Sequence, residues 1–332
     1  MKAIRIVAIG GPEVLRYVDV PDLGKPGPGQ ALVRLKASGV NFMDVGHRRG
    51  TYPMPSPLPF IPGAEGAGVV EAVGEGVSAV KAGDRVAFTG VPAAYAEAVL
   101  AEAERLIHLP EGISFEQGAA FPLQGITAHY LIHEYRKPRA GDVVLIHAAA
   151  GGMGGLLVQW ARHLGATVMG TVSSEAKAAT AKEAGANHVI NYTRDGFAVE
   201  VKRLSDGHGA DLIIDGVGKS TFNGDMEAAA VRGHIVIFGG ASGSADPVSP
   251  NTFMPNSISV SGGNMRNFVR TPGELQQRAK DVVAGIKEGW LKLNLATLPL
   301  SEAAKAHQRL EGRETQGKLV LTVAQQRALT SR

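Results

Sequence analysis

The sequence predicts an α/β protein in which a doubly wound parallel sheet is inserted into a mostly antiparallel β domain. Three observations support this fold class. Residues 1–125 contain short β-rich runs separated by glycine and proline turns. Over residues 126–264, apolar strand-like runs alternate with helical patterns, which indicates a parallel sheet with right-handed crossovers. Residues 265–332 then change to two helical segments and a closing strand, so we expect them to rejoin the first domain.

The first domain is predicted from its strands and turns. Residues 31–35 and 68–73 are rich in apolar and β-branched side chains, as strands are. The Pro-Gly repeat at residues 26–29 and the Lys-Ala-Gly-Asp sequence at residues 81–84 are typical turn sequences. Few helical periods occur before residue 125, which favours a compact β domain.

The second domain is predicted from buried strands followed by amphipathic helices. The run at residues 143–146 is apolar throughout, as expected of a strand buried on both faces. Further strands are expected at residues 167–172, 188–192, 211–215 and 234–238. The helix after the first strand is marked by apolar residues at helical spacing, namely Leu156, Leu157, Trp160, Ala161 and Leu164. The elements expected after residue 265 are helices over 272–289 and near 303–310 and a strand over 318–323.

Composition limits the class of protein. The 332 residues are 44% hydrophobic and 20% charged, as in a globular protein of two domains. The formal net charge is +3 and no run of like charge occurs, so we do not expect nucleic-acid binding. The absence of cysteine excludes disulfides, thiol nucleophiles and cysteine-bound zinc. The N-terminal residues lack the apolar core of a signal peptide and no apolar stretch is long enough to span a bilayer, so we expect a cytoplasmic protein.

A loop of small residues follows the first strand of the second domain. It reads Ala148-x-x-Gly151-x-x-Gly154, with alanine in place of the usual first glycine of a dinucleotide fingerprint, and a helix follows at once. Small residues let the backbone approach a pyrophosphate, and the helix N-terminus presents N–H groups and partial positive charge to it. Strand, loop and helix therefore predict a dinucleotide site that includes Gly151 and Gly154.

The end of the next strand indicates which dinucleotide binds. NAD-binding proteins commonly place Asp or Glu there, on the ribose 2′-hydroxyl. This chain has Ser173, Ser174 and Lys177 instead, and hydroxyls with an ammonium suit a 2′-phosphate. The pattern predicts NADPH. Two alternatives stay open: the serines and lysine serve only as a helix cap and a surface charge, or Glu175 turns inward and favours NADH.

The chain resembles the zinc-independent quinone oxidoreductases, the zeta-crystallin-like branch of the medium-chain dehydrogenase/reductase superfamily. Six motifs carry the resemblance in order along nearly the whole chain, at residues 38–44, 62–68, 82–86, 124–128, 147–154 and 316–320. The resemblance implies a GroES-like catalytic domain with an inserted Rossmann domain. The boundaries expected are residues 1–125 and 265–332 for the catalytic domain and 126–264 for the Rossmann domain.

The resemblance also implies roles for individual residues. Those expected around the adenosine 2′-phosphate are Ser174, Lys177 and Tyr192. Those expected at the pyrophosphate, through their backbone, are Gly152 and Met153. Those expected near the nicotinamide ribose are Phe238 and Gly239, with Lys318 as a further cofactor-binding candidate. Those expected to border the nicotinamide and the substrate are Asn41, Tyr52 and Thr127, the candidate catalytic residues.

Two departures from the wider superfamily concern metal and pocket. Zinc-dependent relatives carry cysteine and histidine ligands where this chain has Asn41 and Ala64, and the loop with four structural cysteines is missing. Asp44, His47 and Glu65 do not complete a ligand set, so we expect no metal. Many quinone-oxidoreductase relatives carry a tyrosine where this chain has Gly46, which would widen the substrate pocket.

Several functions remain open from the sequence. The leading one is NADPH-dependent reduction of a quinone, and the second is reduction of an α,β-unsaturated carbonyl. A third, of another class, is a crystallin-like NADPH-binding or RNA-binding protein with little turnover. His47 is a possible proton donor, whereas His129 and His133 are expected to be packing residues. We also expect a homodimer joined through an edge strand at residues 257–262.

Overall fold

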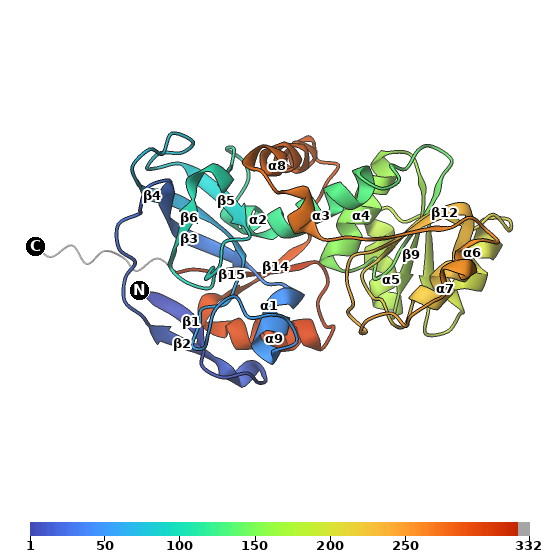
Figure 1. Ribbon diagram of the computed structural model, residues 1–332, viewed down its shortest axis with the longest axis horizontal. Coiled ribbons are helices and arrows are strands. Elements are labelled where there is room, and N and C mark those ends of the chain that lie inside the picture. Colours follow the sequence, from blue (N-terminus) through green and yellow to red (C-terminus); the bar gives the residue numbers. More distant parts are fainter. Residues whose placement is uncertain (325–332) are drawn as a thin grey trace, which may run out of the picture. The chain divides into compact units, whose positions relative to one another are not determined.

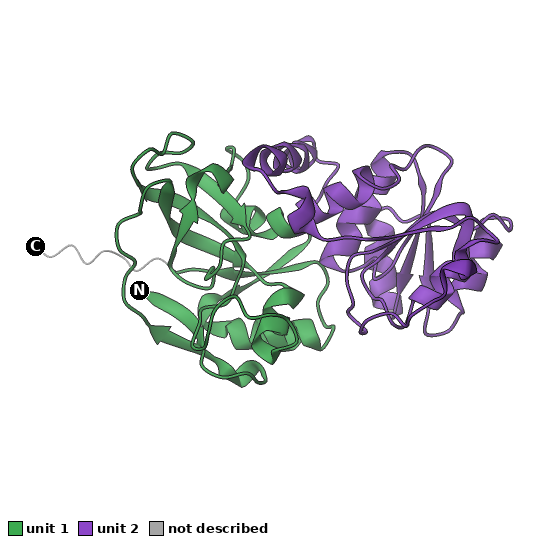
Figure 2. Ribbon diagram, viewed as in Figure 1, with its two compact units in different colours: residues 1–123, 293–332 green, residues 124–292 purple. Residues whose placement is uncertain are grey.

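The computed structural model describes residues 1–324 and divides the chain into two compact units. Residues 1–123 and the described residues from 293 onward form unit 1, and residues 124–292 form unit 2 (Figure 2). The chain leaves unit 1 once and returns to it, which confirms an insertion. No helix within residues 1–324 combines the length and apolar character that crossing a bilayer requires.

Unit 1 is built on an antiparallel sheet with the order β14-β15-β3-β4-β5-β7, in which β6 also pairs with β3 and only β14 and β15 run parallel (Figure 1). Its strands are β1 (Lys2–Ile6), β2 (Leu15–Asp19), β3 (Gln30–Gly39), β4 (Glu65–Val73), β5 (Arg85–Thr89), β6 (Ala98–Glu102), β7 (Ile107–His108), β14 (Leu295–Pro299) and β15 (Lys318–Thr322). Its helices are α1 (Phe42–Arg49), α2 (Phe115–Ala120) and α9 (Ala303–Glu311). Two apolar clusters form its core, and one of them joins β1 to β15 and α9.

Unit 2 is a six-stranded sheet in which every neighbouring pair of strands is parallel. Its strands are β8 (Val143–Ile146), β9 (Thr167–Val172), β10 (His188–Asn191), β11 (Ala210–Asp215), β12 (Ala229–Ile237) and β13 (Ser259–Gly262). Its helices are α4 (Gly152–His163), α5 (Glu175–Glu183), α6 (Phe197–Leu204), α7 (Phe222–Ala228) and α8 (Pro272–Glu288), together with most of α3 (Pro122–His133). The strand order is β10-β9-β8-β11-β12-β13, so the winding direction changes between β8 and β11. The doubly wound sheet predicted from the sequence is confirmed.

The second expected boundary, at residue 265, differs from the division of the structure. Helix α8 belongs to unit 2, although the sequence placed it with the catalytic domain. It packs on α3, where a Cβ at Gly125 would lie 2.7 Å from Val282. Arg278 of α8 also donates to His129 over 3.0 Å. These contacts depend on side chains far apart in sequence, so the local pattern did not indicate them.

A buried ion pair links three segments of unit 1. Lys318 begins β15 and Glu65 begins β4, and their side chains are 3% and 0% exposed. The Lys318 ammonium donates to Glu65 and, over 2.6 Å, to Oδ1 of Asn41, the residue that precedes α1. The Asn41 amide donates to Glu65 over 2.8 Å. Glu65 also accepts from the backbone N–H of Leu123, at the end of the first part of unit 1.

We predict that Lys318→Met lowers the free energy of unfolding by about 3–5 kcal/mol, because it leaves the Glu65 carboxylate buried without its counter-charge. Adding Glu65→Gln should recover much of the loss, since glutamine keeps an acceptor for Asn41 but carries no charge. Urea denaturation measures the free energy of unfolding of the single and the double variant. Lys305→Met is the control, because Lys305 pairs with Glu302 at the surface. Equal stability of Lys318→Met and the control would contradict the prediction.

Candidate functional site

The loop between β8 and α4 has the backbone geometry of a phosphate cradle. Ala148 adopts a left-handed φ of 50°, and the Gly151 N–H donates to the Ala148 carbonyl over 2.9 Å. A Cβ added at Gly154 would lie 2.7 Å from the Cα of Ala149, so only glycine fits there. Gly151 precedes α4, whose first N–H groups have no partner inside the helix. The predicted residues Gly151, Gly152, Met153 and Gly154 therefore lie together at a helix N-terminus suited to an anion.

The end of β9 gathers hydroxyl and ammonium groups. Lys177 donates from its ammonium to the Ser173 hydroxyl over 3.3 Å. Ser174 precedes α5 and accepts the Lys177 N–H over 3.3 Å, so it is also the helix cap that the sequence left open. Tyr192 follows β10 and donates its backbone N–H to Val172 at the end of β9. Donors for a phosphate thus lie at the ends of two neighbouring strands.

Glu175 forms an ion pair with Arg194 over 2.6 Å. The carboxylate is therefore neutralised by a neighbour after β10, and the alternative in which it turns inward to a ribose receives no support. Arg194 is a residue that the sequence analysis did not select, although it is a further cation two positions after Tyr192. Its position in the sequence near the end of the third strand was the available signal.

Phe238 and Gly239 follow β12 beside the end of β11. The Phe238 N–H donates to the carbonyl of Asp215, the last residue of β11. A Cβ at Gly216 would lie 2.7 Å from the Phe238 ring, and one at Gly239 would lie 2.9 Å from the Gly216 carbonyl. The two predicted residues thus lie at the carboxyl ends of the parallel strands, where ligands of such sheets bind.

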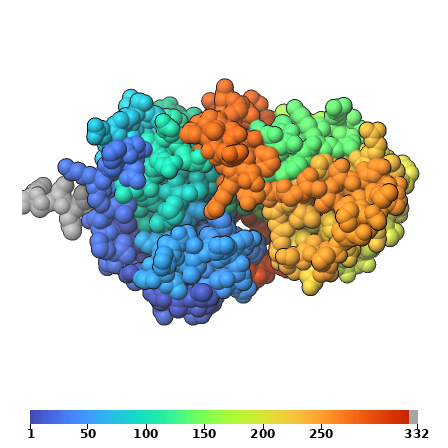
Figure 3. All heavy atoms as spheres, in the orientation of Figure 1, coloured from blue at the N-terminus to red at the C-terminus, as the bar shows by residue number. Residues whose placement is uncertain are grey.

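Asn41 and Tyr52 are the candidate catalytic residues of unit 1. Asn41 is nearly buried and its amide is held by Lys318 and Glu65. Tyr52 is 50% exposed and lies on the segment after α1. The part of the chain near residue 50 is light blue in Figure 3 and reaches the surface of unit 1. Its ring covers Gly46, where an added Cβ would lie 2.8 Å from Cε2 of Tyr52. The space expected to widen the pocket at Gly46 is therefore filled by Tyr52.

Lys318 was expected at the cofactor, and its ammonium is bonded inside unit 1 instead, to Asn41 and Glu65. Thr127 lies on α3 in unit 2 and is buried.

The histidines considered in the sequence analysis make ring contacts. His47 packs its ring edge-on to Tyr52, with ring centroids 6.3 Å apart. The rings of His129 and His133 lie 4.6 Å apart at a tilt of 34°, and both meet Trp160 edge-on, so the two histidines pack inside unit 2.

A second buried network holds α1, the helix that follows Asn41. Asp44 accepts the Asn41 backbone N–H over 2.9 Å and the Tyr95 hydroxyl over 3.1 Å. Burial raises the pKa of Asp44 to about 7. The Tyr95 hydroxyl also lies 3.2 Å from Nε2 of His307, and burial lowers the pKa of that histidine to about 3. Asn41 is thus fixed through both its backbone and its side chain.

Comparisons with known proteins identify the families that the two units resemble. Residues 27–137 match the alcohol dehydrogenase GroES-like domain family, and residues 152–284 match the zinc-binding dehydrogenase family. A 2-haloacrylate reductase of a Burkholderia species is 41% identical, over 94% of this chain and 96% of its own length.

Two quinone oxidoreductases are similar over nearly the whole chain. That of Pseudomonas aeruginosa is 42% identical, over 96% of this chain and 99% of its own length. The structure of the Escherichia coli quinone oxidoreductase, in complex with NADPH, is 36% identical with a TM-score of 0.93 and covers 97% of this chain and 100% of its own. The chain therefore belongs to the quinone oxidoreductase family of the medium-chain dehydrogenase/reductase superfamily.

Proposed function

We propose that this protein binds NADPH and uses it to reduce quinones. The observation that carries the proposal is the pairing of Lys177 with Ser173 at the end of β9, where no acid is directed at a ribose. The relatives named as quinone oxidoreductases, one of them in complex with NADPH, support the same reading.

The residues present fit NADPH at three places. The helix N-terminus at Gly152 offers N–H groups to a pyrophosphate, and the close approach at Gly154 keeps the loop free of side chains. Ser173, Ser174 and Lys177 after β9, with Tyr192 and Arg194 after the neighbouring strand β10, offer donors to a 2′-phosphate. Phe238 and Gly239 border the strand ends that would receive the nicotinamide half.

Bound NADPH would supply a hydride to a conjugated acceptor, and the chain must stabilise the negative charge that develops on the acceptor oxygen. We assign this task to Asn41 and Tyr52. An amide nitrogen carries two hydrogens, and Glu65 accepts one from Asn41, so the second serves the acceptor. The Lys318 ammonium on Oδ1 draws electron density from the amide and strengthens its donors. Thr127 anchors the nicotinamide or the substrate.

Donors of this kind are weaker than a metal, so they suit acceptors that yield a stabilised anion. A quinone does so, and an activated enone does so to a lesser degree. The similarity to a 2-haloacrylate reductase favours α,β-unsaturated carbonyls as the second candidate substrates. We further propose that the site works without zinc, given Asn41 and Ala64 at the ligand positions of zinc-dependent relatives, that water supplies the last proton, and that the protein acts in the cytoplasm.

The first prediction for this function is that Lys177→Ala weakens NADPH binding roughly ten- to a hundredfold, because a charge-assisted bond to phosphate is worth about 1.5–3 kcal/mol. NADH, which lacks the 2′-phosphate, should lose little affinity. Fluorescence titration of both cofactors measures the difference. Lys182→Ala, an exposed lysine of the same helix, is the control. Equal losses for NADPH and NADH would contradict the assignment.

The second prediction is that Asn41→Ala and Tyr52→Phe each lower turnover by about tenfold or more, because each removes a donor to the developing charge. NADPH affinity should stay within a few-fold. Steady-state NADPH oxidation is followed with quinone, enone and aldehyde panels, before and after chelation, with Tyr17→Phe as the control. Robust alcohol oxidation, loss of activity on chelation, or full turnover in the Asn41/Tyr52 double variant would refute this account. A protein that binds NADPH but reduces neither quinone nor enone would favour a binding role.

The third prediction concerns assembly. We propose a homodimer in which β13, the last strand of the unit 2 sheet, pairs with its copy. The Gly263 N–H donates to β12, so alternation along the strand turns the Val260 N–H to the open side. Val260→Pro should therefore give monomers in analytical ultracentrifugation, whereas Val199→Ser, at an exposed position of α6, should not. Dimers that persist in Val260→Pro would place the interface elsewhere.

A further inference from the structure

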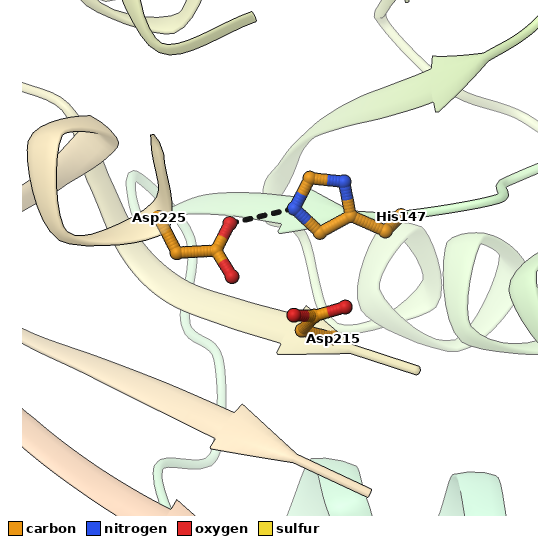
Figure 4. Close-up of side chains that lie close together, drawn as sticks. All are labelled: His147, Asp215 and Asp225. Carbon is orange, nitrogen blue, oxygen red and sulfur yellow. Dashed lines mark hydrogen bonds and ion pairs between the residues drawn. The ribbon is translucent and has the colours of Figure 1, made fainter. Parts of the chain in front are cut away.

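A buried cluster lies where the winding of the unit 2 sheet changes direction. His147 directly follows β8, Asp215 ends β11, and Asp225 lies on α7. The three side chains are buried, and one nitrogen or oxygen atom from each lies within 4.8 Å of those from the other two (Figure 4). In parallel sheets of this kind the ligand crevice lies above the strand ends at this point. The cluster therefore lies at the strand ends where the proposed nucleotide site begins.

His147 joins two elements that the nucleotide site uses. Its Nε2 lies 2.7 Å from Oδ1 of Asp225, and its Nδ1 lies 2.9 Å from the hydroxyl of Thr171 on β9. Thr171 also accepts the backbone N–H of Ala149, the next residue but one along the loop, over 3.0 Å. A Cβ at Gly170 would lie 2.6 Å from that of Ala149, so loop and strand are in close contact. Thr171 comes two residues before Ser173.

The pKa shifts of His147 and Asp225 show why the buried imidazole requires a carboxylate partner. Burial alone would lower the pKa of His147, but the hydrogen bond to Asp225 raises it overall. Burial raises the pKa of Asp225 to about 6, against the opposing effect of His147. Asp215 is satisfied separately, because it accepts the N–H of Val217 over 2.6 Å and the hydroxyl of Thr221 over 2.8 Å. His147 is thus the hydrogen-bond partner of Asp225, and the contact fixes the orientation of the imidazole.

We propose that His147, held by Asp225, is a positioning residue that fixes the pyrophosphate loop against the end of β9. The loop from Ala148 to Gly151 and the Ser173–Lys177 group would contact two different phosphates of one molecule, so their spacing must be set before binding. His147 sets that spacing through its hydrogen bonds to Asp225 and Thr171, without contacting the nucleotide. The inference rests on NADPH binding as part of the proposed function.

A metal is the competing occupant of the same three side chains. Both nitrogens of His147 already have hydrogen-bond partners, and Asp215 accepts donors from its own loop, so these groups are satisfied by the protein itself. One oxygen of Asp225, Oδ2, is buried without a hydrogen-bond partner within residues 1–324. Elemental analysis of the purified protein is therefore part of the test.

The experiment measures NADPH dissociation constants by titration and amide hydrogen exchange of residues 148–152 without nucleotide. Asp225→Ala should weaken NADPH binding by about tenfold or more, since it removes the acceptor of the hydrogen bond from His147. Asp225→Asn keeps an acceptor for Nε2 and should stay within about threefold. Thr171→Val, which preserves volume, removes the other bond and should give an intermediate loss with faster exchange in the loop. The quinone KM at saturating NADPH should not change in any variant.

His208→Phe is the matched control, because His208 contacts Asp211 over 3.1 Å in the same unit but is 54% exposed. If the wild-type protein binds no NADPH, the proposed function fails. If it binds NADPH and both Asp225→Ala and Thr171→Val match the control in affinity and exchange, the positioning role is overturned. A stoichiometric metal whose removal reproduces the effect of Asp225→Ala would overturn it as well. If Asp225→Ala does not fold, the NADPH affinity and loop exchange of Thr171→Val alone decide whether the positioning role holds.

Discussion

A charge that is buried in a protein must be paired, and this requirement organises unit 1 around Lys318 and Glu65. Glu65 starts a central strand and Lys318 starts β15, the second strand after the insertion, so the pair forms only when the chain has come back. Asn41 and the N–H of Leu123 bind the same carboxylate. One ion pair therefore fixes the residue that we assign to the acceptor and both parts of a discontinuous unit.

In unit 2 the corresponding constraint is the direction of the strands. Because all six run parallel, their carboxyl ends meet at one edge, and every loop that could contact a nucleotide starts there. The close contact of Gly170 with Ala149 then requires small residues on both neighbours. The alanine that replaces the first glycine of the fingerprint adopts a left-handed φ, so the backbone shape is retained although the residue differs.

The sequence predicted those features that residues close together in the chain determine. Apolar runs gave the strand at 143–146 with its observed bounds, and the small-residue loop and the Ser173–Lys177 group were found because neighbours in sequence form them. The partner of His147 lies 78 residues away and that of Lys318 lies 253 residues away, so no periodicity indicates either. The placement of α8 in unit 2 was missed for the same reason.

The ammonium of Lys318 differs from a metal ion in what it can contribute to the reaction. A metal binds the acceptor oxygen directly, whereas this ammonium is paired with Glu65 and, in the reaction we propose, would act on the acceptor through the amide of Asn41. Polarising an amide stabilises a developing charge far less than coordination does. The function that we propose therefore requires an acceptor that spreads the charge over its own conjugated system, which a quinone does and a simple aldehyde does not. The expected substrate range follows from this limit on the protein's own donors.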